Sequence, residues 1–215
     1  QGQGGDGTVA DRVTISGAGS GFLTETELLG AGGPLSITAR QLIVQSDGRI
    51  SANTTNAGQA GALTLNLGTL DLTSGGQITT SSTNSTLANA GSAGTITVQG
   101  SSGADSAADS LLVSGTNSLI STTTAGSGQG GNIQIKAGQI QIEKLGRVTA
   151  DTTGKGNAGT ITMTGDSLTV ASGGRIEADL PVRRDAHPQH ARAYSQVVGQ
   201  RVQEDMALVL LERPA

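Results

Sequence analysis

Apolar and polar residues alternate in short stretches along most of the chain. The clearest of these stretches is a pentapeptide that begins with glycine and carries apolar residues at its third and fifth positions. It occurs five times, at residues 33–37, 61–65, 94–98, 131–135 and 159–163, with successive copies 28, 33, 37 and 28 positions apart. Strict alternation predicts half-buried β-strands rather than helices. The spacing indicates a repeat of 28 residues, of which two copies carry insertions.

Each repeat contains two further apolar sites. A second apolar pair follows the pentapeptide, at Leu42/Val44, Leu70/Leu72, Leu111/Val113, Ile140/Ile142 and Leu168/Val170. Six residues after each pair comes a single apolar residue, followed two positions later by a small one: Ile50/Ala52, Ile78/Thr80, Leu119/Ser121, Val148/Ala150 and Ile176/Ala178. The pattern therefore predicts three short strands in every repeat.

Glycine and asparagine recur between these strands. Four residues after each second pair stands one of them, at Gly48, Gly76, Asn117, Gly146 and Gly174. Both residue types accept a left-handed backbone, so we expect a positive φ there. Tracts of small residues that end in glycine, at 56–61, 89–94, 126–131 and 154–159, predict tight corners.

Together these features predict an all-β fold, a parallel β-helix in which each repeat forms one coil. Stacked coils lie about 4.8 Å apart, so equivalent residues form ladders inside the solenoid. Two predicted ladders are Leu35–Leu63–Ile96–Ile133–Ile161 and Ile50–Ile78–Leu119–Val148–Ile176. A disordered Gly/Ser linker is the alternative, but a linker has no reason to keep apolar residues in register through five copies.

The repeats divide the chain into three parts. Residues 1–33 are expected to form an irregular first coil, interrupted at 17–29 by an insertion that holds Phe22, Glu25 and Glu27; residues 34–180 are expected to form the β-helix. Further polar insertions at 82–90 and 99–109 mark either a binding face or tolerated surface variation. The chain begins in mid-repeat, so we expect it to be part of a longer or processed protein.

Residues 181–215 lose the repeat pattern and form a C-terminal tail. Apolar residues at helical spacing predict a helix from about Pro188 to Leu211, although Met206–Leu211 also fits a strand. An open end of a solenoid exposes strand edges. We therefore expect the tail to cap the β-helix, with docking of another protein or copy as the alternative.

Composition excludes several classes of protein. The chain has 34 glycines, one Phe, one Tyr, no Trp and no Cys among 215 residues, and a net charge of −4. Without cysteine there is no disulfide scaffold or thiol nucleophile. The negative charge and the scarcity of aromatic residues argue against binding to nucleic acid.

Candidate chemistry is sparse, and the sequence assigns no catalytic, cofactor-binding or metal residue. His187 and His190 have a spacing that suits metal ligation, but surface histidines beside arginines are the simpler interpretation. Stacking would place Arg147, Thr149 and Asp151 against Arg175, Glu177 and Asp179 on one outer sheet. Such carboxylate pairs serve calcium binding or general base catalysis, although alternating charges on a solvated sheet explain them better. A hydroxyl ladder at Thr64, Thr97 and Thr162 is broken by Ser36 and Gln134, which argues against ice binding.

The repeat motif resembles a known family. Ala-Gly-x-Ile/Leu-Thr-Ile/Leu/Val, followed by Leu-x-Val/Leu-x-Ser-Gly-Gly-Arg/Gln-Ile-x-Ala/Thr, stands most clearly at 159–178 and 61–80. It is similar to the repeats of bacterial exoproteins of the filamentous haemagglutinin type, the secreted partners of two-partner secretion systems. This resemblance covers about residues 8–180. It implies a right-handed β-helix on the bacterial surface, exported through an outer-membrane transporter. No Asn-Pro motif of the family's secretion domain occurs here, and the tail matches no such repeat.

Three functions follow as hypotheses. The first is a non-enzymatic shaft of an extracellular or outer-membrane adhesin that contacts a host surface, a neighbouring cell or a glycan. The second is an extracellular filament of copies joined through the solenoid ends. The third is a polysaccharide lyase or hydrolase.

Overall fold

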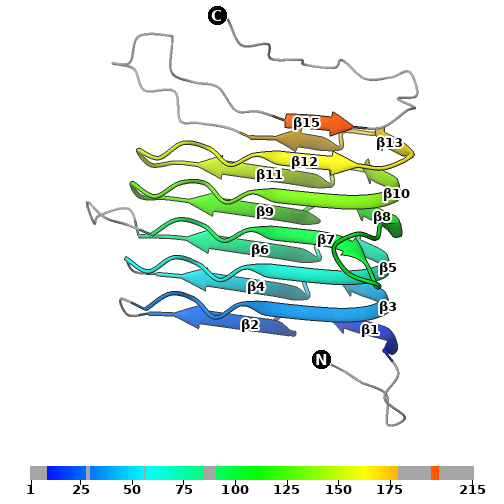
Figure 1. Cartoon of the computed structure of the whole chain (residues 1–215), viewed down its shortest axis with the longest axis horizontal. Helices are drawn as coiled ribbons and strands as arrows, with labels where there is room; N and C mark the ends of the chain where they lie inside the picture. The colour runs from blue at the N-terminus through cyan, green and yellow to red at the C-terminus, as the bar shows by residue number, and fades with distance from the viewer. Residues whose placement is uncertain (1–8, 28–29, 56, 85–90, 179–194, 199–215) are drawn as a thin grey trace, which may run out of the picture.

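The protein is an all-β parallel β-solenoid. The computed structural model describes residues 9–27, 30–55, 57–84, 91–178 and 195–198. Its coils lie directly on one another, from the N-terminal coil at one end to the C-terminal coil at the other (Figure 1). The predicted fold class is confirmed, with about six turns.

Two parallel sheets form the solenoid. The six-stranded sheet contains one strand from each coil: β2 (Gly21–Thr26), β4 (Arg49–Thr54), β6 (Gln77–Ser82), β9 (Leu119–Thr124), β11 (Arg147–Thr152) and β14 (Arg175–Glu177). The nine-stranded sheet contains β1 (Ala10–Ser16), β3 (Leu35–Gln45), β5 (Leu63–Thr73), β7 (Ile96–Gly100), β8 (Ala108–Ser114), β10 (Ile133–Glu143), β12 (Ile161–Thr164), β13 (Ser167–Val170) and β15 (Ser195–Val198).

The predicted ladder from Leu35 to Ile161 is present along the nine-stranded sheet. Leu63 pairs in register with Leu35 on one side and with Ile96 on the other, and the series continues through Ile133 to Ile161. From Leu63 onward these side chains are completely or almost completely buried. The core is therefore a continuous apolar column, which lets a chain with few large residues bury enough apolar surface to fold.

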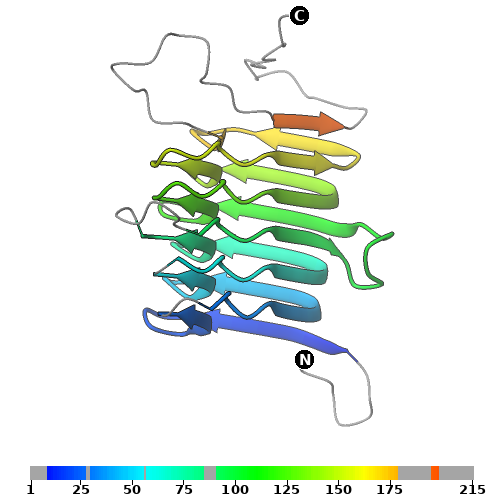
Figure 2. The same cartoon turned by 60° about the vertical axis from the view of Figure 1, so that its left-hand side comes forward.

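The number of strands in a coil differs from the prediction. The first two predicted strands of a repeat join into one strand of 11 residues in β3, β5 and β10. They remain separate as β7 and β8, where residues 101–107 leave the sheet as a protruding loop (Figure 2), and as β12 and β13. Ala39, Leu67 and Ala137 are buried just before the junction, and the alternation then shifts by one position, so that Leu42, Leu70 and Ile140 are the next buried residues.

The second predicted ladder was wrong at one position. Ile120, not Leu119, pairs with Ile78 and Val148. Ile120 is 0% exposed, whereas Leu119 is partly exposed on the outer face. The small residue that follows in this column is accordingly Thr122 rather than Ser121.

The predicted positive φ was also wrong at four of the five turn positions. Asn117 has a positive φ, of 64°. The other four positions have a negative φ: Gly48, Gly76, Gly146 and Gly174. In these four turns the two preceding residues have a positive φ instead: Ser46/Asp47, Ser74/Gly75, Lys144/Leu145 and Ser172/Gly173. Each of the four glycines donates its N–H to the carbonyl three residues earlier, at 2.8–3.0 Å, which closes a turn of the I′ kind.

Close approach between coils explains why glycine occupies the position after each of these turns. A Cβ on Gly76 would overlap the carbonyl oxygen of Val44 in the coil below. Equivalent overlaps would arise at Gly146 with Val113 and at Gly174 with Ile142. Glycine is required here because there is no room for a side chain.

Two files of glycine run along the opposite corner of the solenoid. Each member after the first lies directly on the carbonyl group of the glycine one coil below: Gly30–Gly58–Gly91–Gly128–Gly156 and Gly33–Gly61–Gly94–Gly131–Gly159. The small-residue tracts were predicted to be tight corners. The structure confirms this, since backbone packs on backbone with no side chain between.

Leu145 occupies a turn position that suits glycine, and we expect its replacement to stabilise the protein. It has φ 70° and is 53% exposed. A left-handed backbone costs a residue with a side chain about 1–2 kcal/mol. Leu145→Gly should therefore raise the free energy of unfolding in urea by about 0.5–1 kcal/mol. Gly173→Ala, at φ 79° in the next coil, should lower it; a loss in Leu145→Gly would contradict this account.

The first coil is more regular than the sequence predicts. The segment 17–29, predicted to interrupt the first coil, contains β2, which pairs parallel with β4. Only residues 195–198 of the predicted helix 188–211 are described. They form strand β15, which pairs with β12. The rest of that prediction lies outside the described residues, and the role of the tail stays a prediction.

Candidate functional site

The outer face of the six-stranded sheet carries the charged residues singled out from the sequence. Two columns of side chains run along it, which we call the arginine column and the hydroxyl column. The arginine column contains Arg49, Gln77, Leu119, Arg147 and Arg175. The hydroxyl column contains Leu23, Ser51, Thr79, Ser121, Thr149 and Glu177.

Glu177 joins two arginines at the C-terminal end of this face. Arg147 Nη2 lies 2.8 Å from Glu177 Oε2, and Arg175 Nη1 lies 3.2 Å from Glu177 Oε1. Burial raises the pKa of Glu177, but the hydrogen bonds and charges of the two arginines outweigh this, so that its pKa lies below the ordinary value. The two adjacent arginines thus share one carboxylate, which offsets their mutual repulsion.

Loss of this carboxylate should give a small, pH-dependent loss of stability. We expect Glu177→Gln to lower the free energy of unfolding at pH 7 by up to about 1 kcal/mol, because the arginines are largely solvated. A lowered folded-state pKa contributes stability above the unfolded pKa and loses it as pH falls through the folded pKa. Thermal unfolding of both proteins over a descending pH series should therefore converge in acid. A constant difference would contradict the ion-pair origin.

The structure confirms two of the three predicted stacks on this face, Arg147 on Arg175 and Thr149 on Glu177. Thr149 pairs with Glu177, but it is buried and donates a hydrogen bond from Oγ1 to Ser121 Oγ at 3.0 Å. Asp151 is in β11, while Asp179 lies outside the described residues, as do His187 and His190. In the described part of the chain, no group of three or more His, Cys, Asp or Glu residues is placed to hold a metal ion.

The nine-stranded sheet carries the predicted hydroxyl ladder. Ser36, Thr64, Thr97, Gln134 and Thr162 pair in register, which confirms both the ladder and its interruptions. Beside it, Asn66 donates to Thr38 Oγ1 at 3.3 Å and Gln99 donates to Asn66 Oδ1 at 2.8 Å. These contacts join polar side chains from coil to coil and give this face a repetitive surface.

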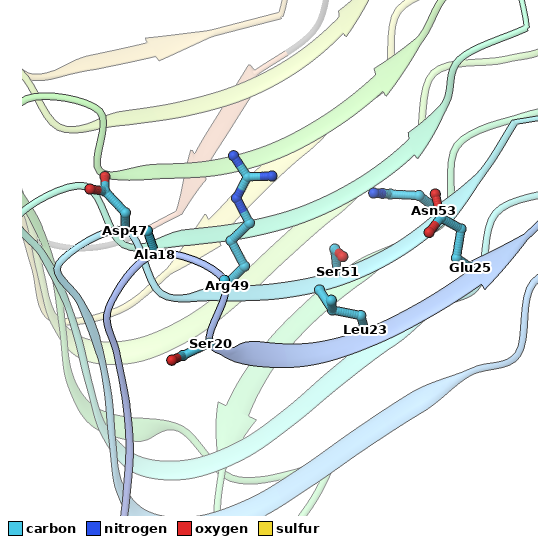
Figure 3. A pocket seen from close by; sticks show the side chains of 9 residues that line it. Ala18, Ser20, Leu23, Glu25, Asp47, Arg49, Ser51 and Asn53 are labelled. Carbon is cyan, nitrogen blue, oxygen red and sulfur yellow. The ribbon is translucent and has the colours of Figure 1, made fainter.

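A surface pocket lies at the N-terminal end of the six-stranded sheet, where the sequence did not indicate a site. It has a volume of about 310 Å³ and opens over β2 and β4 (Figure 3). The lining residues are Ala18, Gly19, Ser20, Leu23, Glu25, Asp47, Arg49, Ser51 and Asn53. One signal could have found it: residues 22–24 lie 28 positions before 50–52, the length of one repeat.

Comparison of the chain with protein-family models, with curated proteins and with solved structures gives no match. The resemblance to exoprotein repeats therefore stays a prediction. The described part of the chain also contains no helix with the length and apolar character that crossing a bilayer requires.

Proposed function

We propose that the protein is a non-enzymatic shaft, a rigid β-helical segment of a secreted or surface-exposed bacterial adhesin. The observation that carries the proposal is the in-register stacking of equivalent residues through about six coils. A solenoid of this kind has contacts only between neighbouring coils and grows along one axis. Its shape suits a spacer better than a closed catalytic cleft.

The surface of the solenoid also supports this role. Hydroxyl and amide side chains repeat at the coil spacing of about 4.8 Å on both sheets. Repeated weak contacts along a rod can add up to firm attachment without any single strong site. Export through an outer-membrane transporter belongs to the same proposal, and it is supported by the repeat motif at 61–80 and 159–178.

Location on the cell surface tests the proposal directly. Antibodies against the β-helix should label intact cells that express the full-length protein, and added protease should remove that label. Deleting one complete repeat should leave the remaining coils folded and shorten the particle in electron micrographs. Labelling found only after the cells are broken open would overturn the proposal.

A second candidate is a filament of copies joined end to end. The observation that favours it is Phe22, which occupies the Ile50–Ile78 column in the outermost described coil and is 45% exposed. An exposed strand edge with an apolar residue invites pairing with another coil. Electron microscopy of the purified protein over a range of concentrations tests it, and particles that stay single at high concentration would exclude it.

A further inference from the structure

The pocket over β2 and β4 combines three charged side chains with one large apolar side chain. Leu23, on the outer face of β2, is 60% exposed and lies beside the buried Ser51. Arg49 stands on one side of them, while Glu25 and Asn53 stand on the other (Figure 3). An exposed leucine surrounded by polar groups that differ in charge is typical of a ligand site.

Arg49 differs from the other two arginines of its column. Arg147 and Arg175 both hold Glu177, which belongs to the hydroxyl column. Beside Arg49 that column contains Leu23 and Ser51 instead of a carboxylate. Within the described part of the chain the guanidinium of Arg49 forms no ion pair and no hydrogen bond. Among the described residues Arg49 therefore has no carboxylate partner like that of Arg147 and Arg175, although Glu25 and Asp47 line the same pocket.

The remaining polar groups define what else the ligand carries. Glu25 and Asp47 are exposed carboxylates, and neither forms an ion pair with Arg49. Carboxylates accept hydrogen bonds from hydroxyl groups but repel densely anionic polymers. Asn53 uses its Oδ1 to accept the N–H of Ser81 at 3.0 Å, which leaves its amide N–H groups as donors toward a ligand.

We propose that this pocket binds a uronic acid residue of a polysaccharide. The sugar carboxylate pairs with Arg49 in the way that Glu177 pairs with Arg147 and Arg175. Its hydroxyl groups donate to Glu25 and Asp47, and its ring packs on Leu23. The inference deepens the proposed function and rests on it for the location of the ligand outside the cell.

Titration of the purified protein with a disaccharide that contains a single glucuronic acid residue tests the pocket. The matched ligand is the methyl ester of the same disaccharide, which keeps the hydroxyl groups but has no carboxylate. Wild type should bind the acid and not the ester. Arg49→Gln should raise the Kd for the acid at least about tenfold, because a hydrogen bond between charged groups is lost.

Arg175→Gln is the matched control, since it removes an exposed arginine of the same column that already has a partner. It should bind like wild type, and circular dichroism should show that both variants keep the β-helix. Equal binding of acid and ester, or equal loss in both variants, would overturn the site. No binding by wild type would overturn the site as well. The proposed shaft function would be tested separately, by surface labelling of cells.

Discussion

Replacing Ile120 by alanine is expected to lower the free energy of unfolding by about 2–5 kcal/mol. The side chain is 0% exposed and packs between Ile78 below and Val148 above. Truncation leaves a cavity that neighbouring coils cannot fill, because their positions are fixed by the ladders of backbone hydrogen bonds on either side. Equilibrium unfolding in urea measures the loss.

Leu119→Ala is the matched control for this prediction. Leu119 precedes Ile120 and has similar volume, but it lies on the outer face in the arginine column. We expect its replacement to cost less than about 1 kcal/mol. If Leu119→Ala proved the more damaging of the two, the register of β9 against β6 and β11 would be wrong.

Gly76→Ala is the second substitution with a large expected effect. The added Cβ would overlap the carbonyl oxygen of Val44, a backbone atom that cannot rotate away. The two coils would have to separate locally, and we expect a loss of about 3 kcal/mol in the free energy of unfolding, the upper range for overpacking. Thermal and urea unfolding should agree on the loss.

Gly33→Ala separates the steric effect from a general cost of losing glycine. Nothing lies within 4 Å of a Cβ at Gly33, and its backbone is not left-handed. We expect it to change stability by less than about 0.5 kcal/mol. Comparable losses at Gly33 and Gly76 would remove the close approach between coils as the explanation.

The sequence was sufficient for the fold because the strongest signal in it was repetition. Apolar positions that recur in register specify which residues stack, so the ladder from Leu35 to Ile161 followed without knowledge of any contact. The error at Leu119 arose from counting a constant six residues after each pair. The turn before β9 has one residue more, and its Ser118 is buried, donating to Ser114 O at 2.7 Å and accepting from Gly75 N at 3.1 Å.

The role of the turn glycines could not be predicted from one repeat considered alone. Left-handed backbone and lack of space both select glycine, and the second cause depends on the coil below. The close approach between Gly76 and Val44 joins residues of different repeats. A single sequence reveals the residue type at such a position but not which of the two constraints selects it.

The candidate site was predictable only in part. Stacking of Arg147 on Arg175 followed from the period, and so did the presence of an acidic neighbour. The pocket was missed because the segment around Leu23 was interpreted as an insertion, although Phe22 and Thr24 occupy the positions of Ile50 and Ala52. The exposure of Leu23, and the lack of an ion-pair partner for Arg49 among the described residues, are three-dimensional properties that the repeat period does not reveal.

The glycine files have a consequence for how such a molecule changes in length. Because main chain packs on main chain at this corner, every coil presents the same packing surface to the next one, whatever its outward side chains are. A tandem duplication of one 28-residue unit in the gene would thus add a coil that stacks in register with its neighbours. Deletion of one unit would likewise bring two matching coils into contact. Selection can therefore change the length of the solenoid one coil at a time, independently of the surface residues that bind a ligand.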